Sequence, residues 1–197
     1  MRDKYGVGDD PYCYPGSNTL INLLNITDQL LLDEAEIDFT TERYRIYKSS
    51  ISTISDLTFT HLTFLHHYLF QDLYDWAGHV RTVDISKGGT RFCTFSRIEP
   101  EAAKIFSRVT NLSNVRVKEI LIKEAASIFC EMNILHPFRD GNGRVQRFFF
   151  EELFFTLGFN ITWPDISTEE WLSSNIAAVN LNLEPLEKIF TSALAKH

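Results

Sequence analysis

Apolar side chains recur at intervals of three or four residues along most of the chain, which brings them to one face of an α-helix. This spacing predicts helices over residues 26–48, 57–78, 101–111, 117–135, 144–157, 167–180 and 184–197. In the second segment the apolar face is formed by Leu62, Leu65, Leu69 and Leu73. In the fourth it is formed by Leu121, Ala125, Ile128, Met132 and Leu135. The fold class that follows is all-α.

Several of these segments carry signals for where a helix begins or ends. Thr27 or Asp28 can cap the first helix, because a short polar side chain accepts hydrogen bonds from N–H groups of the first turn. Ser167, with a glutamate three positions later, has the spacing of a capping box. Gly78 and Gly158 follow apolar helical runs and supply the left-handed conformation in which many helices end.

One segment breaks the helical spacing. Residues 82–95 contain two short β-prone runs, 82–86 and 90–95, on either side of Lys87-Gly88-Gly89. Consecutive glycines allow the positive φ that a tight hairpin turn requires. Because an isolated two-stranded hairpin is marginally stable in water, we expect it to lie as a flap over the helical body.

Composition narrows the class of protein. The 197 residues are enough for one domain with a core, 1–197, in which residues 1–26 are rich in Gly, Pro, Asp and Tyr and are predicted to be irregular. A formal net charge of −7 disfavours direct binding of nucleic acid or of an anionic membrane, since both require a basic field. No run predicts a membrane span or a secretory signal. Three widely spaced cysteines indicate reduced thiols in the cytosol, with Cys130 a core residue.

The residues that can carry chemistry are concentrated in positions 136–147, HPFRDGNGRVQR. Pro137 disfavours helical backbone at His136, so the preceding helix is expected to end there and to present the imidazole to the following loop. An imidazole titrates near neutral pH and therefore suits a general base.

The second half of this motif has the features of an anion site. Gly141, Asn142 and Gly143 lead directly into a helix, where glycines allow close approach of the backbone and N–H groups bind anions. Arg144 and Arg147 share one face of the first turn, where two cations are unfavourable against the helix dipole. This cost suggests that an anion completes the site, and guanidinium groups bind phosphate oxygens well.

Asp140 stands immediately before these glycines. A carboxylate beside a polyphosphate site is best explained as a Mg²⁺ ligand, because Mg²⁺ takes few protein oxygens and completes its shell with substrate phosphates. The motif therefore predicts attack of a hydroxyl group on a Mg²⁺-bound nucleotide phosphate. Each residue also has an ordinary interpretation: a helix-end histidine, a turn, and solvated arginines paired with Glu151. Their occurrence in one ordered run favours the catalytic interpretation.

Residues 136–147 match the signature HPFx[D/E]GNGRxxR at every defined position, and the chain thereby resembles the Fic (filamentation induced by cAMP) family. The hairpin sequence TRFCTF resembles the family's flap, and LFQDLYDWAGHVRTVDI resembles the segment before it. The N-terminal stretch resembles Fic proteins that form two-component toxin–antitoxin pairs. The resemblance covers nearly the whole chain and implies a Fic-fold helical bundle with a β-hairpin flap over the active-site loop.

The resemblance implies a protein adenylyltransferase, a nucleotidyltransferase that moves AMP from ATP, with Mg²⁺, to a Ser, Thr or Tyr hydroxyl of a target protein. In that scheme His136 deprotonates the hydroxyl, Asp140 holds Mg²⁺, and Phe138 anchors the loop in the core. The phosphates would be held by Gly141, Asn142, Gly143, Arg144 and Arg147. The target segment would be bound by strand addition to a flap formed by Thr90, Arg91, Phe92, Cys93, Thr94 and Phe95.

Relatives of this family differ in the group that they transfer. The Doc-like kinases carry Lys in place of Gly143, so the glycine favours AMP transfer here, while other relatives move UMP, GMP or phosphocholine. Two alternatives stay open: transfer of another phosphate-containing group, and a catalytically idle module that only binds nucleotide.

Many Fic proteins are inhibited by the glutamate of an [S/T]xxxE[G/N] helix, which pairs with the second arginine of the motif. No such pattern occurs in residues 1–197. The resemblance therefore implies either a separate small antitoxin whose glutamate binds near Arg147, or an inhibitory segment in another part of the gene product. A toxin of this kind would act in the bacterial cytoplasm, and a secreted effector would act in a host cell.

Residues outside the motif receive simpler interpretations. His61, His66 and His67 lack the spacing of a metal site and are predicted at surface or boundary positions. Tyr12 and Tyr14 are expected to pack the N-terminal segment.

Overall fold

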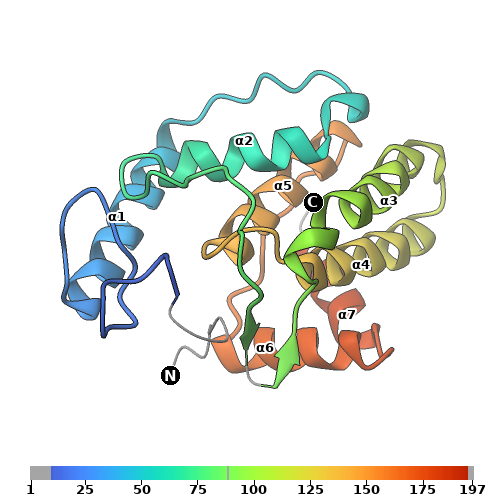
Figure 1. Cartoon of the computed structure of the whole chain (residues 1–197). Helices are drawn as coiled ribbons and strands as arrows, with labels where there is room; N and C mark the ends of the chain where they lie inside the picture. The colour runs from blue at the N-terminus through green and yellow to red at the C-terminus, as the bar shows by residue number, and fades with distance from the viewer. Residues whose placement is uncertain (1–9, 88, 195–197) are drawn as a thin grey trace.

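The computed structural model describes residues 10–87 and 89–194 and is mainly helical (Figure 1). Its α-helices are α1 (Gln29–Ile46), α2 (Phe59–Phe70), α3 (Ile98–Asn111), α4 (Lys118–Leu135), α5 (Asn142–Thr156), α6 (Thr168–Val179) and α7 (Glu184–Ala193). Three single 3₁₀ turns are η1 (Ile54–Asp56), η2 (Phe95–Arg97) and η3 (Leu112–Asn114). Two antiparallel strands are β1 (Ser86–Lys87) and β2 (Thr90–Arg91). The predicted all-α class with one hairpin is confirmed.

Helix α4 lies at the centre of the bundle and packs against α3, α5, α6 and α7. All five residues of its predicted apolar stripe are buried, as are the four leucines predicted to form the inner face around α2. Most of the aromatic side chains of α5 fill the space between these helices. Phe150 and Phe154 are buried near Phe190 of α7, and Phe149 is buried near Phe106 of α3. The core therefore holds the N-terminus of α5 and the C-terminus of α4 in fixed positions, and the motif connects these two ends.

The predicted N-terminal capping residues of two helices are confirmed. The Asp28 side chain caps α1 by accepting a hydrogen bond from the N–H of Leu31, and the Ser167 side chain caps α6. The predicted end of α2 at Gly78 is wrong, because the helix ends at Phe70 and the chain continues in turns. Leu73 remains buried in these turns. The apolar spacing therefore continues past the end of the helix and overestimates its length.

The flap is shorter than the sequence predicts. Only two residues of each strand pair, with Ser86 opposite Arg91 and Lys87 opposite Thr90, so the predicted strand to Phe95 is wrong. The chain leaves the hairpin because its N–H groups find acceptors elsewhere. The N–H of Cys93 donates to the carbonyl of Ile134 in α4, and the N–H of Phe95 donates to the Asp84 carboxylate.

The described part of the N-terminal segment, residues 10–28, consists of turns and one isolated bridge between Cys13 and Leu20, as predicted. Residues 1–9 of the predicted irregular segment lie outside the described residues. Tyr12 packs edge-to-face on Trp76, with ring centroids 5.7 Å apart. The three cysteines are free thiols, and Cys130 is buried as predicted. None of the described helices is long and apolar enough to cross a membrane.

Candidate active site

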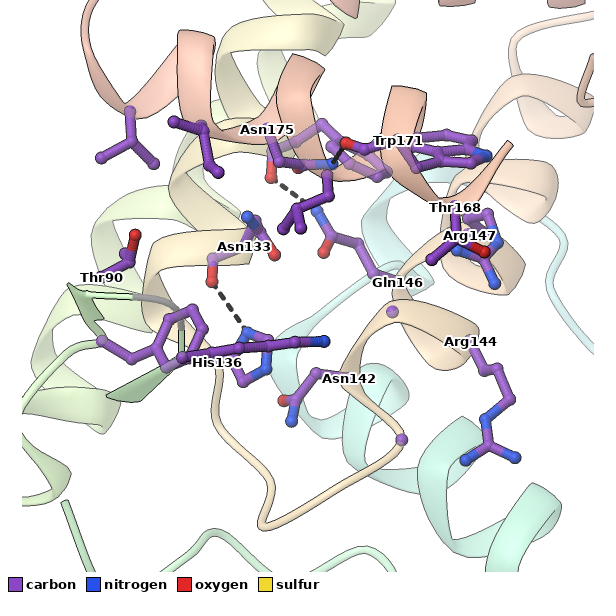
Figure 2. A pocket seen from close by; sticks show the side chains of 18 of the residues that line it. Thr90, Asn133, His136, Asn142, Arg144, Gln146, Arg147, Thr168, Trp171 and Asn175 are labelled. Atoms are coloured by element: carbon purple, nitrogen blue, oxygen red, sulfur yellow. Dashed lines mark hydrogen bonds between the residues drawn. The ribbon is translucent and has the colours of Figure 1, made fainter. Parts of the chain in front are cut away.

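A cavity of about 430 Å³ opens between the flap, the C-terminal end of α4, the N-terminal end of α5 and one face of α6. Figure 2 shows Thr90 of the flap on one side of it, Arg144 and Arg147 on the other, and Trp171 and Asn175 of α6 above. All seven motif residues proposed for chemistry or phosphate binding line it together: His136, Asp140, Gly141, Asn142, Gly143, Arg144 and Arg147. The folded chain thus brings the two ends of the motif to one cavity.

Helix α4 ends at His136, as the following proline predicts. The left-handed conformation of His136, with φ of 42°, does not follow from the proline, which favours extended backbone at the preceding residue. Its Nδ1 lies 3.0 Å from the carbonyl oxygen of Asn133, visible as a dashed line in Figure 2. Because a carbonyl only accepts hydrogen bonds, this contact assigns the proton to Nδ1 and the lone pair to Nε2. The ring of Phe92 from the flap stacks on the imidazole, with centroids 3.7 Å apart. The imidazole is therefore fixed in the orientation and tautomer of a base that acts through Nε2.

The loop between the two helices rests on His66 of α2. The N–H of Gly78 donates to His66 Nδ1 over 2.8 Å, so Nε2 carries the proton and donates to the carbonyl oxygen of Asp140 over 3.0 Å. The His66 ring also stacks on Phe138, with centroids 3.9 Å apart, and both side chains are buried. The prediction of a surface or boundary position for His66 is wrong, because the motif loop covers this face of α2. His61 is also buried, against Glu152.

The Gly-Asn-Gly segment is shaped by contacts within the loop. Gly141 has φ of +76°, and a side chain there would overlap the ring of Phe70. The Asn142 amide accepts from the N–H of Phe138 over 2.9 Å and donates to the carbonyl of the same residue over 2.8 Å. Its side chain therefore closes the loop, and what remains for a ligand is the backbone at the start of α5, where N–H groups have no intrahelical acceptor.

The two arginines of the motif have different surroundings. Arg144 Nη2 forms an ion pair of 2.5 Å with Glu36 Oε2 of α1, and its guanidinium lies 4.7 Å from the centroid of the Phe70 ring. Arg147 lies 5.5 Å from the centroid of the Trp171 ring, and no carboxylate within residues 10–87 and 89–194 forms an ion pair with it. Burial, assisted by the charge of Arg144, lowers the pKa of the Arg147 guanidinium. An anion beside Arg147 would relieve that cost.

A buried arginine joins the flap to the end of α4. Arg81 donates to the carbonyl of His136 over 2.8 Å and to that of Val83 over 2.6 Å, and it also donates to the carbonyl of Cys93. Its own N–H donates to the carbonyl of Pro137. Any shift of the flap is therefore coupled to the residue that carries the imidazole.

Sequence reasoning missed four residues that support the site: Asp10, Glu36, His66 and Arg81. Only Glu36 could have been identified from the sequence. It lies four residues from both Leu32 and Thr40, and these three residues form the buried stripe of α1. Asp10 holds Arg139 of the motif through an ion pair of 2.6 Å, and nothing in the spacing of the two residues indicates it.

The residues present fit a magnesium ion only together with a substrate. No group of three or more His, Cys, Asp or Glu side chains among the described residues could hold a metal ion. Among the described residues that line the cavity, Asp140 is the one that carries a carboxylate. One carboxylate with phosphate oxygens completing the shell is the arrangement that Mg²⁺ commonly adopts in nucleotide sites.

Comparison with known proteins gives a family match, curated relatives and solved structures of the same fold. The model of the Fic/DOC family matches residues 56–154. A relative from Salmonella typhimurium, named probable protein adenylyltransferase Fic, is 36% identical over 100% of this chain and 98% of its own length. Protein adenylyltransferase VbhT of Bartonella schoenbuchensis is 35% identical over 88% of this chain and 36% of its own length. The Fic domain of a Bartonella quintana cell filamentation protein, solved with bound ADP, is 27% identical with a TM-score of 0.82, covering 92% of this chain and 93% of that one.

Proposed function

The chain belongs to the Fic/DOC family, and from this membership we propose that it is a protein adenylyltransferase, which moves AMP from ATP to a hydroxyl side chain of a target protein. The observation that carries the proposal is the position of His136. Its imidazole is fixed as the Nδ1–H tautomer at the wall of a cavity that also holds a helix N-terminus and two arginines. A site that only binds nucleotide needs the helix and the arginines but no base.

In this reaction His136 Nε2 takes the proton of the target hydroxyl as its oxygen attacks the α-phosphorus of ATP. The bond between the α-phosphorus and the bridging oxygen breaks, and pyrophosphate leaves with that electron pair. Catalysis rests mainly on positioning and on neutralising charge, because the protein forms no covalent bond to the phosphate. The proton passes from His136 to solvent before the next cycle.

The phosphate groups are proposed to lie along the start of α5. The backbone of Gly141, Asn142 and Gly143 faces the cavity there, and Arg144 and Arg147 supply positive charge beyond it. Asp140 would hold Mg²⁺, which neutralises phosphate charge when it is bound. The ADP bound to the Bartonella quintana relative supports a nucleotide as the ligand.

The nucleobase is proposed to lie against α6. The cavity wall there is mostly apolar, which suits the flat face of a base, and it is formed by Phe129, Trp171, Leu172, Ile176 and Val179. The amide side chains of Asn133 and Asn175 stand at its edges.

The target segment is proposed to pair with the flap over a shorter edge than the sequence suggests. The N–H groups of Phe92, Cys93 and Phe95 already donate to acceptors within the chain. Thr90 lines the cavity, whereas the Arg91 side chain forms an ion pair with Asp84. We therefore confine strand addition to Thr90 and Arg91, and the remaining flap residues serve to hold the hairpin on α4.

Inhibition in trans is proposed to act at Arg147. Arg144 already has a carboxylate partner, whereas Arg147 has no ion pair among the residues that the structure describes. A glutamate from a small antitoxin, paired with Arg147, would occupy the place of the terminal phosphate. Co-purification from the native host should then recover a small partner protein that supplies this glutamate. Recovery of the chain alone and fully active would contradict the proposal.

The proposed activity is tested by incubating the chain with α-labelled ATP, Mg²⁺ and a bacterial lysate, beside a His136→Ala variant. We expect label on a protein band with the wild-type chain and none with the variant. Label that appears only from γ-labelled ATP would identify a kinase instead. Bound ATP without any transferred label would identify a nucleotide-binding module.

A further inference from the structure

Helix α1 buries a carboxylate in the middle of its inner stripe. Leu32, Glu36 and Thr40 face inward, and Glu36 is 1% exposed. Many of the other side chains of α1 are exposed, so the helix had ample room to carry this charge on its outer face. Burying a carboxylate is costly unless charged or hydrogen-bonding partners compensate for the lost water. The partners of Glu36 therefore indicate the role of the buried carboxylate.

Two of these partners approach Glu36 from different elements. The Tyr74 hydroxyl donates to Oε1, and Arg144 Nη2 lies 2.5 Å from Oε2. Burial, reinforced by the charge of Glu36, raises the pKa of Tyr74, so its hydroxyl remains a donor at all physiological pH values. With Tyr74 on one oxygen and the surrounding core excluding water, the carboxylate is held in one orientation.

Arg144 is held on a second side as well. Its guanidinium lies 4.7 Å from the centroid of the Phe70 ring, while 28% of its side chain remains exposed and lines the cavity. One nitrogen contacts Glu36, which leaves the other edge of the planar group for a ligand. Arg147 has no such ion pair among the described residues.

We propose that Glu36 is a positioning residue for phosphate recognition: it fixes the guanidinium of Arg144 in the cavity before nucleotide binds. The inference rests on the proposed function, because it takes Arg144 to contact the β- and γ-phosphates. Preset orientation reduces the conformational entropy that the arginine loses on binding, so the gain appears as affinity for di- and triphosphates. Binding of AMP, whose single phosphate lies at the start of α5, does not depend on it.

The test measures dissociation constants of ATP, ADP and AMP with Mg²⁺ by calorimetry. We expect Glu36→Ala to weaken ATP and ADP roughly tenfold, the equivalent of one ion-pair contact, while AMP changes less than about twofold. Glu34→Ala is the matched control, since it removes the same charge from an exposed position of the same helix. Thermal unfolding checks that each variant is folded. If Glu36→Ala does not fold, Glu36→Asp keeps the charge, shortens its reach, and should still weaken ATP selectively.

A double-variant cycle separates positioning from a general effect on the fold. Glu36→Ala should add nothing to the loss of ATP affinity already caused by Arg144→Ala, because Glu36 acts through that arginine. Additive losses would overturn the proposal. So would unchanged or tighter ATP binding by both Glu36 variants, because Glu36 would then be only a counter-ion that competes with phosphate. If the wild-type chain does not bind ATP, the proposed function fails together with the inference, and this outcome is distinct from a failure confined to the variants.

Discussion

His136 and Gly141 both have left-handed backbone conformations, with φ of 42° and +76°, and they bound the loop that carries Phe138 and Asp140. A residue with a β-carbon is rarely stable in this region unless its surroundings hold it there. At His136 the surroundings are the hydrogen bond from Arg81 to its carbonyl and the contact of its ring with Asn133. At Gly141 the absence of a side chain suffices, and the Phe70 ring occupies the space that one would need.

This difference predicts opposite effects of two alanine substitutions in the Gly-Asn-Gly segment. Gly141→Ala should lower the free energy of unfolding by about 1–3 kcal/mol, because it adds backbone strain and a clash with Phe70. Gly143→Ala should not lower it, because a β-carbon there meets only Arg147, at 3.7 Å, and alanine favours a helix. Urea unfolding of both variants measures the difference. Equal losses would contradict the role assigned to the conformation of Gly141.

Helix α5 carries two neighbouring glutamates, and folding shifts the pKa values of their carboxyl groups in opposite directions. Burial raises the pKa of Glu151, despite hydrogen bonds from Tyr44 and Trp163. Burial acts in the same sense on Glu152, but contacts with His61, Ser49 and Tyr47 outweigh it and lower the pKa. Successive residues of a helix point in different directions, so the two carboxylates have different surroundings. The hydrogen-bond donors around Glu152 outweigh the cost of burying its charge, whereas those around Glu151 do not.

The two glutamine variants should therefore differ in stability and in pH dependence. Glu152→Gln should lose about 1–3 kcal/mol at pH 7, since a charged acceptor of several hydrogen bonds is replaced. That deficit should vanish as pH falls through the lowered folded-state pKa, because the wild-type chain loses the same contribution there. Thermal melting of both proteins between pH 7 and pH 3 measures it, and a constant deficit would contradict the assignment.

Glu151→Gln should be at least as stable as the wild-type chain at pH 7, because the charged form of Glu151 is disfavoured by folding. Its advantage should shrink as pH falls through the raised pKa, where the wild-type carboxyl group becomes protonated. The same melting series measures this second slope, whose sign is opposite to that for Glu152. A lower stability of Glu151→Gln at pH 7 that persists on acidification would show that the carboxylate is needed as a hydrogen-bond acceptor.

Across the whole molecule, the N-terminal segment is fastened to the motif by contacts between residues far apart in sequence. Asp10 pairs with Arg139 over 2.6 Å, and both side chains are largely buried. The Tyr12 hydroxyl accepts from the N–H of Thr82, just before the flap. The segment therefore borders both the catalytic loop and the base of the flap, the two parts of the site that Arg81 joins from the inside.

Asp10→Asn should loosen the catalytic loop, because the buried guanidinium of Arg139 loses a charged partner. We expect the free energy of unfolding to fall by roughly 1–3 kcal/mol, with faster amide exchange in residues 138–143. Asp165→Asn, at an exposed position, is the matched control. Unchanged exchange in the loop would show that the N-terminal segment packs there without holding it.

The sequence by itself determined the features that depend on neighbouring residues. Apolar spacing gave the helices, Asp28 and Ser167 gave their caps, and Pro137 ended α4 at His136, because sterics and hydrogen bonds act locally along the chain. The order of residues in the motif predicts the site, because its histidine, carboxylate, glycines and arginines are adjacent in the chain. The two glycines allowed the hairpin but did not set its length, since that depends on acceptors in α4.

Only the tertiary structure decided which polar side chains support the motif. Spacing identifies a face of a helix but not the residue that it meets, so the pairing of Glu36 with Arg144 required the packing of α1 beside α5. His66 became a buried support because the loop crosses α2, and Arg81 became a link because four backbone carbonyls converge on it. Apart from the bonds of Arg81 to Val83 and Cys93, these contacts join residues more than fifty positions apart, where helix packing, and not local preference, sets the distance.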